Sequence, residues 1–295
     1  MQVTILIGPT ASGKSALAVA RGRTENATII NADAMQCYDT LPILTAQPRG
    51  DERGDEQGGL PHRLYGFLDA TQTTTAADWT ARAATEIRAA FATGRAPWLV
   101  GGTGLYLKAL MQGLSPMPDI PDDIRARVRA TPRAALYAEL QARDPVMSAR
   151  LEPGDTQRIM RAMEVLETTG ESLSAWQNQP PRKPDGDWAY RVIALNPPKD
   201  ILERNIRARL DAMVDAGVME EVRALAQKID DGAVPENAPV TVAHGFKYLR
   251  KALKGDMTLE DAIERTAIET RQYTKRQRTW LRHQITPDEV IGENQ

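Results

Sequence analysis

The sequence predicts an α/β fold in which a parallel β-sheet is covered by helices and interrupted by an inserted helical domain. Residues 8–15 read Gly-Pro-Thr-Ala-Ser-Gly-Lys-Ser, which is the G-x-x-x-x-G-K-[ST] pattern of a phosphate-binding loop. An apolar, β-branched run at residues 3–7 precedes this loop, and a helix-forming run at residues 15–20 follows it. Strand, loop and helix in that order are typical of a P-loop NTPase-like sheet.

The first 115 residues continue this alternation of strands and helices. Short apolar runs bounded by turn residues predict buried strands, and the alanine-rich segment between them predicts a helix that stops at Gly94. Residues 49–59 contain four glycines among acidic side chains, which indicates a mobile surface loop. In chain order, we expect strand 28–31, helix 76–94, strand 97–100 and helix 105–112.

Proline-punctuated segments mark the borders of the insertion. Prolines recur in residues 115–121 and 180–184, and the sequence between them is arginine-rich, helical in pattern and poor in strand formers. The strand pattern returns at 190–195, and helical sequence follows from residue 199 to residue 283. We therefore expect an α/β core at 1–115 and 187–295, whose C-terminal region is helical, and a helical insertion domain at 116–186.

Composition favours an ordinary globular protein of a reducing compartment. The 295 residues are 42% hydrophobic and 26% charged. The single cysteine, Cys37, cannot form an internal disulfide. No apolar run approaches the roughly 20 residues of a membrane span, and the first strand is too short for a signal-peptide core. We expect a cytoplasmic protein that does not contact membranes.

The phosphate loop predicts that a di- or triphosphate binds here. Gly8 and Gly13 let the backbone wrap, so that several N–H groups point into one concavity at the start of a helix. Lys14 can reach the terminal phosphates, and the Ser15 hydroxyl is placed to bind Mg²⁺. The alternative is an ordinary glycine-rich turn, which the flanking strand and helix disfavour.

Two further strand ends carry candidate chemistry. Asp33 follows strand 28–31, and carboxyl ends of parallel strands share one edge of a sheet, so Asp33 is expected near the phosphate loop. Asp33 is a candidate general base or Mg²⁺ ligand, with a turn-forming aspartate as the alternative. Strand 97–100 ends in Gly-Gly-Thr-Gly instead of the aspartate usual in NTP hydrolases, which disfavours a GTPase. The Thr103 hydroxyl suits a diphosphate or an uncharged base.

The C-terminal region is basic although the whole chain has a net charge of −2. Residues 240–283 contain ten Lys and Arg against five Asp and Glu, a local excess typical of a surface that contacts polyanions. Tyr273 and Trp280 could stack on bases there. The alternative is a solvated amphipathic helix. Four basic residues fall on one helix face at spacings of four, three and four: Arg271, Lys275, Arg278 and Arg282.

Segments along nearly the whole chain resemble the tRNA dimethylallyltransferases, also called tRNA isopentenyltransferases. The resemblance is carried, in family order, by residues 8–15, 33–38, 45–48, 61–64, 100–106, 155–162, 245–247 and 275–282. It implies that the dimethylallyl group of dimethylallyl diphosphate is transferred to N6 of adenosine 37 in the tRNA anticodon loop, with release of diphosphate. Nothing in the sequence demands more than a monomer.

The resemblance also implies the site residues. Asp33 would be the general base, with Thr103 near the reacting centre and Lys14 on the leaving diphosphate. Gln36 would help to place the adenine, and Mg²⁺ would be the cofactor, held by Ser15. Diphosphate-binding residues would be Gly8, Pro9, Thr10, Ala11, Ser12, Gly13, Lys14, Ser15 and Arg209. Residues in contact with tRNA would be Asp33, Ala34, Met35, Gln36, Thr103, Arg125, Gln157, Arg158, Ile159, Met160, Arg161, Gly245, Lys247, Lys275, Arg276, Arg278 and Arg282.

Some residues depart from the family pattern. Gln47 stands where a lysine is usual, Asn205 stands where an arginine is usual, and Ala34, Leu44, His244 and Phe246 also differ. Three other functions remain open from the residues alone. They are a P-loop kinase that phosphorylates a small metabolite with ATP, an RNA-binding protein without catalysis, and a prenyl transferase that acts on free AMP.

Overall fold

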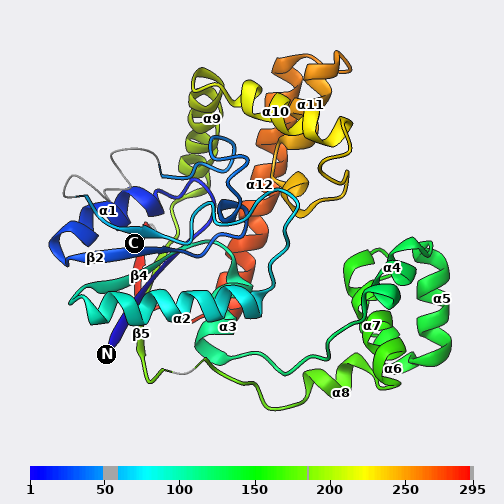
Figure 1. Cartoon of the computed structure of the whole chain (residues 1–295). Coiled ribbons are helices and arrows are strands. Elements are labelled where there is room, and N and C mark those ends of the chain that lie inside the picture. Colours follow the sequence, from blue (N-terminus) through cyan, green and yellow to red (C-terminus); the bar gives the residue numbers. More distant parts are fainter. Residues whose placement is uncertain (49–58, 185, 293–295) are drawn as a thin grey trace. The chain divides into compact units, whose positions relative to one another are not determined.

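The computed structural model describes residues 1–48, 59–184 and 186–292, and it divides the chain into two compact units (Figure 1). The first unit comprises Met1–Met111 and Pro184–Gln295, and the second comprises Gln112–Lys183. The second unit therefore starts four residues before the expected insertion 116–186 and ends three residues before its end.

A six-stranded sheet forms the centre of the first unit. Its order is β3-β2-β4-β1-β5-β6, and each pairing among the described residues is parallel. The central strand β1 pairs on both sides, with Ile5 opposite Leu99 and Val192. A strand covered on both faces needs a continuous apolar run, which residues 3–7 supply. The strands are β1 (Gln2–Ile7), β2 (Ala27–Asn31), β3 (His62–Arg63), β4 (Ala96–Gly101), β5 (Ala189–Leu195) and β6 (Glu289–Ile291).

The strand register brings three chain segments to one edge of the sheet. Ile7 at the end of β1 lies opposite Gly101 at the end of β4, and Asn31 at the end of β2 lies opposite Val100. The phosphate loop, the segment with Asp33 and the turn with Thr103 therefore begin side by side. This is the edge where parallel α/β sheets bind ligands.

Helices flank the sheet and their apolar sides form its core. Trp79 and Ile87 of α2 are fully buried, and Trp79 Nε1 donates a hydrogen bond of 3.0 Å to the carbonyl of Asn31. Thr75 and Asp78 form a capping box that starts α2. The first three helices are α1 (Lys14–Thr24), α2 (Ala76–Ala92) and α3 (Gly104–Gln112).

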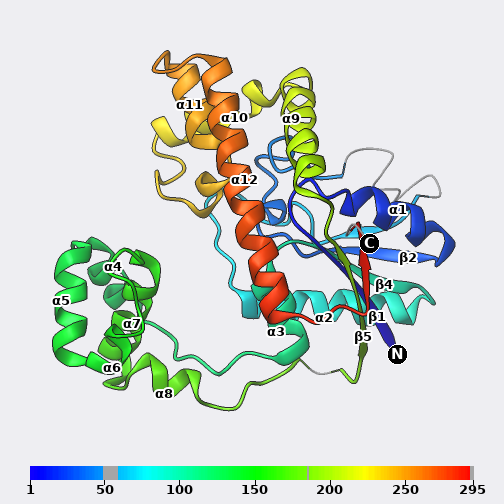
Figure 2. The ribbon, with the colours of Figure 1, turned by 180° about the vertical axis from the view of Figure 1, so that it is seen from behind.

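Four further helices complete the first unit after β5. They are α9 (Lys199–Asp215), α10 (Val218–Asp230), α11 (Phe246–Lys254) and α12 (Leu259–Gln284). The long helix α12 packs on α9 and α11 and extends back to α3, as Figures 1 and 2 both show. Its buried side carries small and polar residues: Ala262, Thr266, Ala267, Thr270, Thr274 and Gln277.

The second unit is helical and has its own core. Helix α7 supplies the largest share of this core, with Ile159 and Met163 fully buried against Leu136 and Leu140 of α5. Asp155 caps the start of α7, and Gly170, with φ +73°, ends it. The helices are α4 (Asp122–Ala130), α5 (Arg133–Arg143), α6 (Pro145–Ser148), α7 (Thr156–Thr169) and α8 (Leu173–Gln177).

The predicted fold class is confirmed, because the sheet is parallel, helices flank it, and helices follow β5. Where the sequence predicted the end of a strand or helix, the observed end lies within two residues of it. The exception is the first helix, which continues to Thr24. The two edge strands β3 and β6 were not expected, since runs of two and three residues carry no readable period. The expected loop 49–59 lies outside the described residues, apart from residue 59.

Candidate active site

The phosphate loop lies between β1 and α1, as its sequence pattern predicts. Gly13 takes φ +89°, a left-handed conformation that glycine adopts without steric cost. The N–H groups in the first turn of α1 have no acceptor within the helix, and they lie at the positive end of the helix dipole. Ser15 in this turn is exposed and lines the neighbouring cavity. The loop is therefore built to receive an anion.

Lys14 folds back across the loop. Its Nζ donates hydrogen bonds to the carbonyls of Gly8 (2.9 Å) and Pro9 (2.7 Å), and it lies 3.5 Å from Ser12 Oγ. Burial lowers the pKa of Lys14 to about 8, while Asp33 acts in the opposite direction and Arg209 adds to the lowering. The ammonium group thus lies in a poorly solvated place, where a phosphate would be a strong partner.

Two helices hold the loop from outside. Asn205 of α9 donates a 3.0 Å hydrogen bond from Nδ2 to the carbonyl of Ala11, which takes the left-handed φ of +62°. Gln277 of α12 accepts hydrogen bonds at Oε1 from the backbone N–H of Thr10 (2.8 Å) and from its hydroxyl (3.2 Å). Thr10 therefore has its donors directed to α12, which leaves the amides nearer the start of α1 to bind a phosphate.

Asp33 is fixed by its neighbours while one carboxylate oxygen stays free. Its backbone N–H donates to Asn31 Oδ1 (2.8 Å), and its carbonyl accepts from Asn31 Nδ2 (2.9 Å). The N–H of Met35 donates to Asp33 Oδ1 (3.0 Å). Within the described residues, Oδ2 has no hydrogen-bond partner. A carboxylate that is held firmly but incompletely bonded is suited to accept a proton.

The turn after β4 is shaped by protein contacts. A Cβ on Gly101 would lie 2.2 Å from the carbonyl carbon of Ala32, one on Gly102 would lie 2.4 Å from Gln277 Nε2, and one on Gly104 would lie 2.4 Å from the Trp280 ring. Close approach of the chain itself therefore requires these glycines. The hydroxyl of Thr103 accepts the N–H of Ala34 at 2.9 Å and keeps its own hydrogen for a further partner.

Two cavities in the described part of the first unit meet at this edge. The phosphate cavity, of about 350 Å³, is lined by residues 10–16 and by Gln36, Tyr65 and Asn205. The apolar cavity, of about 90 Å³, has a wall made of Met35, Leu44, Ile206, Leu210, Met213 and Ala243. Both cavities are lined by Thr10, Ala11, Asp33, Thr45 and Arg209. Asp33 thus borders a polar, anion-binding space on one side and an apolar space on the other.

Part of the lining of the apolar cavity is polar but neutral. Tyr273 and His244 have ring centroids 4.4 Å apart, and both line this cavity. Burial lowers the pKa of His244 and raises the pKa of Tyr273 to about 12, so both side chains are uncharged near neutral pH. Asp33 and Arg209 are the charged side chains among the residues that line this cavity.

The glutamines near Asp33 have different surroundings. Gln36 Nε2 donates to the carbonyls of Thr45 (2.8 Å) and Ala46 (3.0 Å), which leaves its Oε1 as the atom available to a ligand. Gln47 is buried, and its Nε2 donates to the carbonyl of Tyr38 at 2.6 Å. This residue is part of the protein core and is not among the residues that line either cavity.

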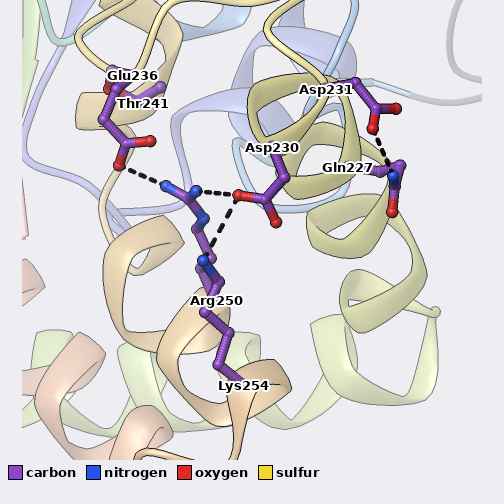
Figure 3. A network of polar contacts seen from close by, with 7 residues as sticks. All are labelled: Gln227, Asp230, Asp231, Glu236, Thr241, Arg250 and Lys254. Carbon is purple, nitrogen blue, oxygen red and sulfur yellow. Dashed lines mark hydrogen bonds and ion pairs between the residues drawn. The ribbon is translucent and has the colours of Figure 1, made fainter.

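Several of the basic residues from the 240–283 region are neutralised by ion pairs. Arg250 binds Asp230 (2.7 Å) and Glu236 (2.5 Å), and Lys254 shares Asp230 at 3.5 Å, a network shown in Figure 3. Lys247 binds Glu269 at 2.6 Å, and Arg271 binds Glu264 at 3.2 Å. The local basic excess is therefore smaller than the sequence suggests.

Five Lys and Arg residues of α12 have no ion-pair partner within the described residues: Arg265, Lys275, Arg276, Arg278 and Arg282. Lys275 and Arg282 are exposed, and Arg278 is half-buried. Arg276 is also exposed, with its guanidinium 5.5 Å from the centre of the Tyr273 ring. The N–H of Gly245 donates to Glu269 at 3.2 Å, so this backbone donor is already used. Together with Lys251 of α11, which is exposed and unpaired in the described part of the chain, these cations of α12 are what remains of the predicted polyanion surface in the first unit.

The expected RNA-contacting residues of the second unit differ in exposure. Arg125, Arg158 and Arg161 each lie near an acidic side chain, at 3.8, 3.3 and 3.6 Å from Asp122, Asp155 and Glu164. Ile159 is fully buried, so its side chain cannot contact RNA from this fold. Met160 is half-buried against the core, and Gln157 is exposed.

Comparison with known proteins identifies the family. The family model described as IPP transferase matches residues 36–284, and the model described as Isopentenyl transferase matches residues 1–55. The chain is 45% identical to the tRNA dimethylallyltransferase of Nitrobacter hamburgensis over 287 residues, which are 95% of this chain and 87% of the relative. It is 44% identical to the tRNA dimethylallyltransferase of Agrobacterium fabrum over 289 residues, 96% and 94% of the two chains. The chain belongs to the IPP transferase family.

Solved structures agree with this membership. The tRNA isopentenylpyrophosphate transferase of Bacillus halodurans has a TM-score of 0.66 and 30% identity, with 99% of this chain and 89% of that chain covered. A eukaryotic dimethylallyltransferase acting on tRNA has a TM-score of 0.78 and 26% identity, with 95% and 69% covered. This IPP transferase is therefore an enzyme of a prenyl transferase family, as its sequence predicts.

Sequence reasoning missed several residues of the IPP transferase site. Asn31, which is fully buried, fixes both backbone groups of Asp33. The apolar wall from α9 and the contacts of Gln277 were also missed. A detectable signal was the series of polar residues on the buried side of α12, at positions 266, 270, 274 and 277, because polar side chains on a buried helix face need specific partners.

Two kinds of feature are absent from the described residues of this IPP transferase. No group of three or more His, Cys, Asp or Glu side chains there is arranged to hold a metal ion. None of the helices there is both long and apolar enough to cross a bilayer.

Proposed function

We propose that this enzyme transfers the dimethylallyl group of dimethylallyl diphosphate to N6 of adenosine 37 in the anticodon loop of tRNA and releases diphosphate. The observation that carries the proposal is the position of Asp33, which borders both the phosphate cavity and the apolar cavity. A donor with a charged head and a five-carbon apolar tail needs two such spaces next to the reacting carbon. The names of the relatives support the same donor class and a tRNA acceptor.

The diphosphate end of the donor would bind at the phosphate loop. When the bond between C1 and oxygen breaks, negative charge grows on the departing diphosphate. Lys14, Arg209 and the amides at the start of α1 surround that position, and fixed charges and dipoles stabilise such charge without reorganisation. The apolar wall from α9 would contact the five-carbon chain. The phosphates are thus the leaving group, and the carbon chain is what is transferred.

The acceptor end of the reaction would take place at Asp33. The lone pair of N6 is delocalised into the adenine ring, so the amine is a weak nucleophile. As the bond between N6 and C1 forms, Asp33 Oδ2 would take the N6 proton. Gln36 Oε1 would orient the amine as an acceptor, and the Thr103 hydroxyl, which already accepts from Ala34, would act as a donor.

The residues present fit a magnesium ion that is held mainly by the substrate. Mg²⁺ usually keeps several waters and takes one or two protein ligands together with phosphate oxygens. The Ser15 hydroxyl is exposed, lines the phosphate cavity and has no hydrogen-bond partner within the described residues. Ser15 would hold the ion, which when bound supplies further charge neutralisation at the diphosphate.

The anticodon loop would bind along the exposed cations of α12. To reach Asp33 the target base must leave its stack, at a cost of a few kcal/mol by analogy with flipped bases. Tyr273, which lines the apolar cavity, offers a ring on which a base can stack. In the second unit, the exposed Gln157 and Arg158 and the half-buried Arg125 and Arg161 would add RNA contacts. A monomer in the cytoplasm remains our expectation.

The test of this function is an incorporation assay. The enzyme is incubated with Mg²⁺, dimethylallyl diphosphate labelled in the prenyl group, and unmodified tRNA that carries adenosines at positions 36 and 37. We expect label in the tRNA and equal amounts of diphosphate released. Label in free AMP but not in tRNA, or turnover of ATP with a small metabolite, would contradict the proposal.

The RNA part of the proposal predicts that Arg278→Ala weakens tRNA binding. Removal of one phosphate contact should make the free energy of tRNA binding less favourable by about 1–3 kcal/mol. It should also lower the slope of log K against log salt concentration by about one. Filter binding over a range of salt concentrations measures both quantities. The matched control is Arg23→Ala, since Arg23 is an exposed cation of α1. An unchanged salt slope for Arg278→Ala would show that this arginine makes no contact with an RNA phosphate.

A further inference from the structure

Gln277 is a buried polar residue that connects two loops through its side-chain amide. It is only 6% exposed. Its Oε1 accepts both donors of Thr10 in the phosphate loop, at 2.8 and 3.2 Å, and its Nε2 donates to the carbonyl of Gly102 at 3.2 Å. The two loops follow different strands, β1 and β4. One side chain of α12 thus fixes the distance between them.

The Gln277 side chain is tightly packed against the turn after β4. A Cβ on Gly102 would lie 2.4 Å from Gln277 Nε2, and one turn further along α12 a Cβ on Gly104 would lie 2.4 Å from the Trp280 ring. Helix α12 therefore rests directly on the backbone of the turn after β4. Side chains in such close contact transmit a displacement instead of absorbing it.

The phosphate loop needs outside support. Ala11, the residue after Thr10, takes φ +62°, a conformation that a residue with a Cβ disfavours. Strained backbone persists where the surrounding structure fixes it. Here the fixing contacts come from Asn205 at the carbonyl of Ala11 and from Gln277 at the N–H of Thr10.

We infer that Gln277 is a positioning residue for the leaving diphosphate. Gln277 is not among the residues that line either cavity, so it acts through Thr10 and the loop. By fixing the conformation of the loop, Gln277 keeps Lys14 and the amides at the start of α1 ordered before a phosphate binds. This lowers the conformational-entropy cost of phosphate binding. The inference rests on the proposed function for the identity of the phosphate ligand.

The test is the binding of inorganic pyrophosphate with Mg²⁺ by calorimetry. Gln277→Met keeps the buried volume but removes every hydrogen bond of the amide, and we expect pyrophosphate to bind about tenfold more weakly. In steady-state assays the KM for dimethylallyl diphosphate should rise by a similar factor, while the tRNA dissociation constant changes by less than about twofold. The matched control is Gln284→Met on the same helix, where Oε1 accepts only from Lys108 at 3.0 Å.

A second variant keeps the inference testable if Gln277→Met does not fold. Gln277→Glu keeps an acceptor for Thr10, loses the donor to Gly102 and adds negative charge behind the loop, so pyrophosphate affinity should fall at least as far. Folded variants that bind pyrophosphate within about twofold of the wild type would overturn the positioning role. If the wild type binds pyrophosphate but transfers no prenyl group, the proposed function fails while the result for Gln277 stands. If the wild type binds no pyrophosphate, both fail.

Discussion

Asp33→Asn is expected to lower the transfer rate by about 10²- to 10⁴-fold, the usual contribution of a general base. The asparagine keeps an Oδ1 acceptor for the N–H of Met35, which Asp33 now binds at 3.0 Å, so the loop should hold its shape. Only the ability to take the N6 proton is lost. Single-turnover transfer to tRNA measures the chemical step, and tRNA binding should be unchanged.

The control for Asp33→Asn is a second aspartate of the same segment. Asp39 is exposed and accepts from the Thr40 hydroxyl at 2.9 Å, and it lines neither cavity. Asp39→Asn should therefore transfer prenyl groups at the wild-type rate. A rate for Asp33→Asn within about threefold of the wild type would show that another group accepts the proton.

Lys14→Met is expected to reduce kcat/KM for dimethylallyl diphosphate by about 10²- to 10³-fold, the loss typical when one preorganised group at a developing negative charge is removed. Methionine approximates the length of the lysine stem but carries no charge. The ammonium of Lys14 lies within 2.9 Å of the loop carbonyls of Gly8 and Pro9, so a bound diphosphate would meet it directly. Steady-state transfer assays at varied donor concentration give the value.

Binding of tRNA separates this effect from general damage. The RNA surface on α12 does not include Lys14, so Lys14→Met should bind tRNA as the wild type does. Lys228→Met on α10 removes an exposed lysine and serves as the control, with activity unchanged. A Lys14→Met enzyme with normal donor KM and normal rate would rule out a role for this ammonium on the leaving group.

Much of the candidate site at the carboxyl edge of the sheet could be predicted from local sequence patterns. The loop 8–15 specifies its own turn, because Gly13 must take a left-handed φ and Lys14 must begin a helix. Asp33 could be placed near it because both follow buried parallel strands, whose carboxyl ends share an edge. Such features depend on residues close together in sequence and on one general rule of topology.

The contacts that brace these residues could not be predicted in the same way. Gln277 and Thr10 are 267 positions apart, and Asn205 and Ala11 are 194 apart. No local pattern states which distant side chain meets which loop. The excess of basic residues in 240–283 overstated the free positive charge for the same reason. Arg250, for example, is neutralised by Asp230 and Glu236, which precede it by 20 and 14 positions on the chain.

The sequence by itself determined that a phosphate loop opens a parallel α/β sheet and that a carboxylate follows a neighbouring strand. Local backbone preferences and hydrophobic periodicity are sufficient for that, because they act over a few residues. Only the tertiary structure decided that the glycines at 102 and 104 accommodate Gln277 and Trp280 and that Gln47 is buried. It also decided that Arg271 of α12 is paired, whereas Arg265, Lys275, Arg276, Arg278 and Arg282 are free of ion pairs in the described chain. These outcomes depend on packing and ion pairing between distant segments, which exist only once the chain has folded.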